Sequence, residues 1–189
     1  MYTQHIVIDF EMNPVSEKIL AKDGCAIGAE IIEIGAVKVN SALEIAGRFS
    51  RTVRQEYNFE IAGYIRTLTG INTKEMSASL PLRESLTLLF DWIGTEEKTR
   101  IYSWSNADLI QLRKECAAKE IPFPENMKRW LDFQAVFSRL PGLEDAPRQM
   151  SLHDAADRFG IKFDEKGAHR ALYDAEKTTE LLIPVRLRI

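Results

Sequence analysis

The chain has little cysteine, glycine and proline, and these absences exclude several classes of protein. Two cysteines, Cys25 and Cys116, stand far apart among 189 residues. Neither has a neighbour at the spacing of a metal ligand, so a disulfide framework and a cysteine-rich zinc site are excluded. Ten glycines and seven prolines are too few for a low-complexity or fibrous chain.

The chain also lacks an excess of positive charge and a long apolar run. Its 25 Lys and Arg against 28 Asp and Glu give a formal net charge of −3 at pH 7. This balance argues against a protein that coats nucleic acid or an anionic membrane by bulk electrostatics, although a local phosphate site remains compatible with it. Charges interrupt every apolar stretch well before the ~20 residues of a membrane span. Because the start also lacks the pattern of a signal peptide, we expect a cytoplasmic protein with no membrane partner.

The hydrophobic fraction of 45% and the charged fraction of 28% are those of an ordinary folded protein. No repeat or linker-like segment divides the chain, so residues 1–189 are expected to form a single domain. Segments rich in Ile and Val predict early strands at residues 5–10, 30–39 and 48–53. Their short connections favour an antiparallel meander, with a long loop expected at residues 13–29.

Helical periodicity dominates the rest of the chain. It predicts helices at 81–93, 107–119, 151–159 and 170–183, with a further strand at 100–104 and a short strand or strand-to-helix junction around 131–136. Ser151 and Asp154 form the start of a capping box, and Pro184 is expected to end the last helix. Strands followed by alternating strands and helices predict an α/β fold, with a mixed β-sheet flanked by helices.

Two carboxylates stand at the end of the first predicted strand, in Asp9-Phe10-Glu11. Residues two apart in an extended chain point to the same side, so both side chains project together. The bare pattern is weak, since Asp174-Ala175-Glu176 also fits it. Its position at the end of a buried strand makes it a candidate site.

The other candidates flank two predicted helices. His169 and Asp174 are five residues apart and cannot share one face of a helix. They can reach one pocket if His169 precedes the helix and Asp174 lies on its second turn. Asp108 falls in a first helical turn, where the helix dipole alone favours an acid. His5 and His153 fit ordinary places in a strand and a first helical turn.

Together these residues predict a metal site. Four carboxylates in one pocket repel one another, and they stay ionised when cations neutralise them. The absence of cysteine or a second histidine favours two Mg²⁺ or Mn²⁺ ions over Zn²⁺. Two such ions can assist an in-line displacement at phosphorus. The predicted set comprises Asp9, Glu11, Asp108 and Asp174, with His169 beside them.

The ordered motifs resemble those of the DEDDh 3′→5′ exonucleases of the DnaQ-like superfamily. The three motifs are matched by residues 8–11, 104–108 and 169–175, and supporting segments by 30–37 and 68–71. The resemblance runs from residue 5 to residue 182. It implies an RNase H-like fold, in which the first three strands are antiparallel and the later ones parallel.

The resemblance also implies a role for each residue of the set. Asp9, Glu11 and Asp174 would hold one metal ion, with Asp9 bridging to a second ion and Asp108 completing the site. His169 would take the proton from the attacking water, since its ordinary pKa of ~6.5 suits a base near neutral pH. The expected activity is the release of nucleoside 5′-monophosphates from the 3′ end of single-stranded DNA or RNA.

For substrate binding, the resemblance implies two groups of residues. Phe10, Met12 and Asn13 would line the pocket of the terminal nucleotide, while Leu68, Thr69 and Ile71 would form a wedge against the last base. Asn106 would contact the substrate, and Trp104 would either stack on a base or belong to the core. Met12 and Tyr173 depart from the family pattern, which more often has Thr and an acidic residue there.

Two other hypotheses remain open at this point. One is a catalytically silent nucleic-acid-binding protein on the same fold, and the other is an RNase H-like endonuclease. The sequence does not choose between DNA and RNA, because that choice depends on contacts to the 2′-hydroxyl. A homodimer, a polymerase partner or an RNA-processing partner are all compatible with it, and the 13–29 loop could cover the substrate.

Overall fold

The structure is a computed structural model that describes residues 2–23, 27–123, 127, 129–140, 142–143, 147, 149–164 and 167–186. Cys25 lies outside the described residues. The strands are β1 (Gln4–Pro14), β2 (Ala29–Val39), β3 (Ile45–Arg54), β4 (Leu80–Pro81), β5 (Thr99–Ser103) and β6 (Trp130–Asp132). The helices are α1 (Glu17–Asp23), α2 (Gly63–Thr69), α3 (Thr73–Ser77), α4 (Leu82–Ile93), α5 (Ala107–Ala118), α6 (Phe133–Phe137), α7 (Leu152–Arg158) and α8 (Ala171–Val185).

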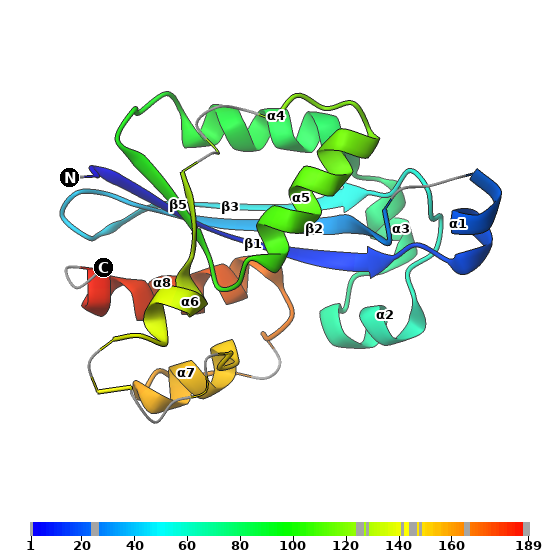
Figure 1. Cartoon of the computed structure of the whole chain (residues 1–189). Coiled ribbons are helices and arrows are strands. Elements are labelled where there is room, and N and C mark those ends of the chain that lie inside the picture. The colour runs from blue at the N-terminus through cyan, green and yellow to red at the C-terminus, as the bar shows by residue number, and fades with distance from the viewer. Residues whose placement is uncertain are drawn as a thin grey trace.

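The strands form one mixed sheet in the order β4-β3-β2-β1-β5-β6 (Figure 1). β1, β2 and β3 are antiparallel neighbours, whereas β5 runs parallel to β1 and β6 parallel to β5. The predicted mixed sheet, antiparallel first and then parallel, is therefore confirmed. β2 follows β1 as far as Pro14, but β5 pairs only with Gln4–Val7. The second half of β1 thus has one free edge.

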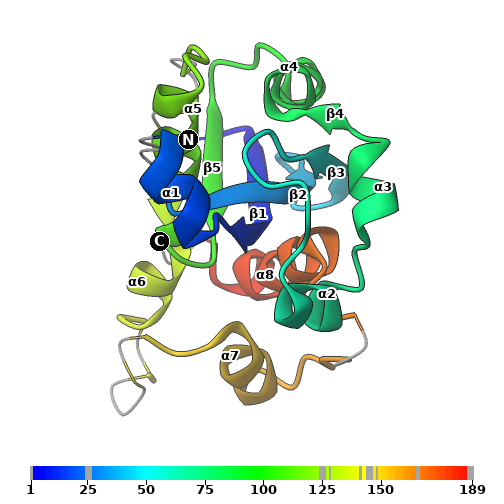
Figure 2. The same ribbon diagram turned by 90° about the vertical axis from the view of Figure 1, so that its right-hand side faces the viewer.

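Side chains alternate between two faces of β1, and each face has its own core. Ile6, Ile8 and Phe10 pack in the core that includes α4 and α5, whereas Val7 packs in the core that includes α8. Figure 2 shows α4 on one side of the sheet, with α8 and α2 on the other and α7 beyond them. Every odd-numbered residue from Val7 to Glu11 therefore faces α8.

Two boundaries predicted from proline are wrong. β1 continues through Pro14, because the amide of Val15 donates to the Gly28 carbonyl just before β2, and the nitrogen of Pro14 faces the free edge, where no ladder bond is lost. The expected 13–29 loop instead begins in β1 and contains α1. Pro184 lies inside α8, because the carbonyl four residues before it belongs to exposed Glu180, which water reaches.

Other predicted boundaries are confirmed. α4 begins at Leu82, one residue later than predicted because Pro81 belongs to β4, and it ends as predicted at Ile93, before Gly94 with its φ of 81°. Ser151 caps α7 by accepting a hydrogen bond from the Asp154 amide at 3.0 Å. Among the described helices, none is long and apolar enough to cross a membrane.

Candidate active site

The first three acids meet at the second half of β1, two from the strand itself and one from α5. Asp9 and Glu11 continue the face that Val7 presents to α8. The amide of Phe10, which points to the free edge, donates to Asp108 Oδ1 at 3.0 Å. Asp108 lies in the first turn of α5 and is only 5% exposed. Because β5 ends at Ser103, α5 can bring a third carboxylate against the backbone of Phe10, the residue between Asp9 and Glu11 in the sequence.

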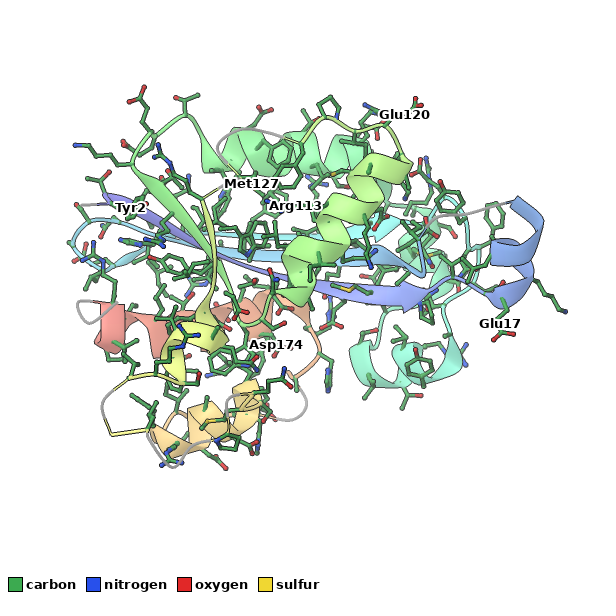
Figure 3. The ribbon with its side chains drawn as sticks, in the orientation of Figure 1. Tyr2, Glu17, Arg113, Glu120, Met127 and Asp174 are labelled. Carbon is green, nitrogen blue, oxygen red and sulfur yellow. The ribbon has the colours of Figure 1, made fainter. Side chains whose placement is uncertain are left out.

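The start of α8 brings the remaining two residues. His169 precedes the helix in the left-handed region, with a φ of 62°, and its side chain is exposed. Asp174 lies in the first turn of α8 (Figure 3), not in the second as predicted. Its Oδ2 accepts a hydrogen bond from the His169 amide at 3.2 Å. Ligand atoms of Glu11, His169 and Asp174 all lie within 4.8 Å of one another.

The carboxylates raise one another's pKa values. Burial raises the pKa of Asp9 well above its usual range, and the charges of Asp108, Asp174 and Glu11 add to this. Burial likewise raises the pKa of Glu11 to about 8, that of Asp108 to about 7 and that of Asp174 to about 6. Hydrogen bonds from the amides of Phe10 and His169 oppose the last two shifts. The protein itself therefore leaves this negative charge largely uncompensated.

The residues present fit a site for divalent cations. Asp174 Oδ1 is buried, and no described residue gives it a hydrogen bond. A buried carboxylate oxygen without a hydrogen-bond partner lowers the stability of the fold unless a ligand binds to it. Carboxylate oxygens are the donors that Mg²⁺ and Mn²⁺ prefer. Asp9, Glu11, Asp108 and Asp174 are the residues that could hold such ions.

A cavity of about 360 Å³ opens beside His169, between α2 and α7. It is lined by Thr67, Leu68, His153, Phe163, Ala168 and His169. The Phe163 ring meets the His153 imidazole edge to face, with centroids 5.1 Å apart. His153 and Phe163 were not among the predicted site residues, because nothing in their local sequence indicates that α7 lies next to α2. The cavity is wide enough for a flat, partly apolar group such as a nucleobase.

The structure separates the predicted substrate residues into exposed and buried ones. Leu68 and Asn106 are exposed, and Met12 is half-buried. The remaining side chains, those of Phe10, Asn13, Thr69, Ile71 and Trp104, are buried.

The buried side chains of Trp104 and Asn13 make hydrogen bonds inside the protein. Trp104 donates from Nε1 to the Met150 carbonyl at 3.1 Å and packs against the Phe133 ring, as its core alternative predicts. Asn13 accepts from the Ala62 amide at 2.8 Å and donates to Gln55 Oε1 at 3.1 Å. These contacts hold the segment that leads into α2.

Comparison with known proteins gives concordant matches. A family model described as an exonuclease, RNase_T, matches residues 6–182. The 3′-5′ exonuclease Snipper of Drosophila melanogaster is 27% identical over 173 residues, which cover 82% of this chain and 60% of Snipper. ERI1 exoribonuclease 2 of Xenopus laevis is 28% identical over 198 residues, which cover 93% of this chain and 27% of that protein. The chain thus spans less than two thirds of the length of these relatives.

Among solved structures, the nuclease domain of 3′hExo, a DEDDh family member bound to rAMP, superimposes with a TM-score of 0.83. The sequence identity is 23%, and the match covers 99% of this chain and 93% of that one. This likeness confirms the RNase H-like fold.

Proposed function

The chain belongs to the RNase_T family of exonucleases, and from this premise we propose that it is a metal-dependent 3′→5′ exonuclease. Its substrate is the 3′ end of single-stranded RNA or DNA, and its product is a nucleoside 5′-monophosphate. RNA is the first candidate, because one of the relatives named above is an exoribonuclease. The acid cluster is the set of carboxylates of Asp9, Glu11, Asp108 and Asp174. The observation that carries the proposal is the buried Asp174 Oδ1 within this cluster, which has no described hydrogen-bond partner and lies next to His169.

In this mechanism the acids hold two divalent ions and His169 moves the proton. Asp9, Glu11, Asp108 and Asp174 would hold the ions through their carboxylate oxygens. When bound, the ions neutralise the phosphate and acidify the attacking water. An imidazole nitrogen of His169 accepts the proton of that water, and the exposed position of the ring lets it release the proton to solvent.

The cavity beside His169 supports a substrate with at least one unpaired nucleotide. Its walls combine the aliphatic Leu68, the aromatic Phe163 and the imidazole of His153. Such walls suit the flat face of an unstacked base, and a base inside a duplex is not free to enter. The formal charge of −3 is consistent with this, because binding would depend on ions and on a free 3′ end instead of a basic surface.

A labelled-oligonucleotide assay tests the proposal. Single-stranded RNA and DNA of the same sequence, labelled at the 5′ end, are incubated with the protein and Mg²⁺ or Mn²⁺. A ladder that shortens from the 3′ end, absent in Asp9→Ala and strongly slowed in His169→Ala, is the expected result. Internal cuts would favour an endonuclease. Binding without any product over the range of metals would favour a catalytically silent protein and would overturn the proposal.

A further inference from the structure

A fifth carboxylate, Glu33 of β2, lies next to the acid cluster and has a different role. Glu33 is the register partner of Glu11 across the β1–β2 ladder, so its side chain lies on the same face of the sheet. It is 1% exposed. It was not among the candidate site residues of the sequence, because the supporting segment 30–37 predicts a strand and gives none of its residues a role in the site.

Both oxygens of Glu33 are already engaged by the start of α8. Arg170 donates to Oε1 from Nε at 3.1 Å and from Nη2 at 2.6 Å. The amide of Ala171, the first residue of α8, donates to Oε2 at 2.9 Å. Arg170 itself provides no side-chain cap for the helix. Glu33 therefore supplies from a neighbouring strand the acceptor that the first amide of α8 needs.

Gly35, two residues further along β2, fixes the same turn by close contact. A Cβ atom at Gly35 would lie 2.0 Å from the carbonyl carbon of Ala171, so the helix start rests directly on the backbone of β2. Gly35 is also the register partner of Asp9. The backbone just before α8 is thus held by an ion pair at Glu33 and by van der Waals contact at Gly35.

His169 stands immediately before this anchored turn, in a left-handed conformation that a residue with a side chain rarely adopts. We propose that Glu33 and Arg170 are positioning residues, which hold the His169 imidazole in its catalytic orientation. This inference depends on the proposed exonuclease activity. Because the Glu33 oxygens are occupied by Arg170 and Ala171, Glu33 acts through the helix start and not as a metal ligand.

Arg170→Met removes the ion pair while leaving the Ala171 amide and the Gly35 contact in place. We expect kcat for the shortening of RNA to fall ~10- to 100-fold, the range that a small misplacement of a catalytic group can cost. KM should change by less than about threefold, since Arg170 lies outside the cavity. Arg170→Lys should restore part of kcat. The matched control is Arg48→Met, which removes an exposed ion pair between β3 and Glu176 of α8 and should leave kcat unchanged.

A double-mutant cycle separates positioning from general stability. In a His169→Ala background, Arg170→Met should lower kcat by less than about twofold, because the group it positions is gone. A loss as large as in the wild-type background would overturn the proposal. If the wild-type protein does not shorten RNA at all, the proposed function fails instead, so the two failures are distinguishable.

An NMR measurement that does not depend on nuclease activity completes the test. The chain has three histidines, so the imidazole resonances of the metal-free protein can be assigned by NMR with one variant each. Arg170→Met and Glu33→Gln should shift the His169 resonances and leave those of His5 in place. Unchanged His169 resonances in a folded Arg170→Met protein would contradict the proposal even if activity fell.

Discussion

Two groups of buried or half-buried carboxylates among the described residues differ in how their charge is balanced. The acid cluster consists of Asp9, Glu11, Asp108 and Asp174. The buried polar network joins β1, β2, the segment after β3 and the end of α5, and consists of Asn13, Glu30, Gln55, Glu115 and Lys119.

In the buried polar network every charge has a partner. Lys119 Nζ lies 3.0 Å from Glu30 Oε1 and 2.8 Å from Glu115 Oε1. Glu30 also accepts hydrogen bonds from the backbone amides of residues 56–58, and Glu115 accepts one from the Ile31 amide at 2.9 Å. This network joins α5 to the segment that leads into α2.

The acid cluster has no such cation within it. No described lysine or arginine forms an ion pair with these four acids, and Arg170, whose charge lowers the pKa of Glu11, is paired with Glu33. A buried network with a central lysine and bonded amides serves the fold, whereas like charges left together at the end of a sheet serve a ligand. The predictions below test this difference.

The largest expected effect is on activity. Asp174→Asn removes one charge from the acid cluster, and we expect nuclease activity to fall by ~10³-fold or more while the melting temperature does not fall. The measurement is the rate of 3′ shortening together with thermal unfolding. Asp154→Asn is the matched control, because Asp154 also lies in a first helical turn but is exposed. Equal losses in both variants would contradict the account.

The buried polar network should show the opposite behaviour. Lys119→Met leaves Glu30 and Glu115 buried without their cation, and we expect the free energy of unfolding to fall by about 3–5 kcal/mol. Arg48→Met, which breaks an exposed ion pair, should change it by less than about 1 kcal/mol. Urea unfolding measures both. A Lys119→Met protein as stable as the wild type would contradict the claim that the buried polar network stabilises the fold.

The two groups should also differ in their response to pH. The folded, metal-free protein has pKa values of about 8 for Glu11, about 7 for Asp108 and about 6 for Asp174, whereas unfolded carboxyls titrate at roughly 4. The stabilising contribution of these groups is therefore complete below pH ~4 and is lost as pH rises towards 8.

Thermal unfolding in chelator should accordingly show this stability contribution declining between pH 5 and pH 8. Saturating Mg²⁺ should raise the melting temperature more at pH 8 than at pH 5, because the ionised cluster binds it. Glu11→Gln should flatten the pH dependence in chelator. If Mg²⁺ raised the melting temperature equally at both pH values, the assignment of the metal site would be contradicted.

The smallest effect is expected at Asn13, which links the buried polar network to α2. Asn13→Ala leaves the Ala62 amide without its acceptor, and we expect a loss of about 1–3 kcal/mol in the free energy of unfolding. Since α2 carries Leu68 of the cavity wall, KM for a single-stranded substrate should rise more than kcat falls. Steady-state kinetics over a range of substrate concentrations measures this, and a change confined to kcat would contradict a role through α2.

Sequence reasoning found the parts of the site that have a local signal. Asp9 and Glu11 follow from alternation in a strand, and His169 with Asp174 from the start of a helix. Glu33, His153 and Phe163 gave no such signal, because their roles depend on which helix packs against which strand. Pro14 and Pro184 misled because the cost of a proline depends on its surroundings. For Pro14 these are the strand that could pair with the missing amide, and for Pro184 the solvent near the Glu180 carbonyl that loses its donor.

The most direct test of the account is the stability of Asp9→Asn compared with the wild type, at pH 8, in chelator and in saturating Mg²⁺. We predict that the variant is at least as stable as the wild type in chelator, because it relieves repulsion within the acid cluster. We also predict that it gains much less stability from Mg²⁺ and shows no 3′ shortening. A variant that is destabilised in chelator and stabilised by Mg²⁺ as much as the wild type would contradict the claim that these acids are held together for metal-dependent cleavage.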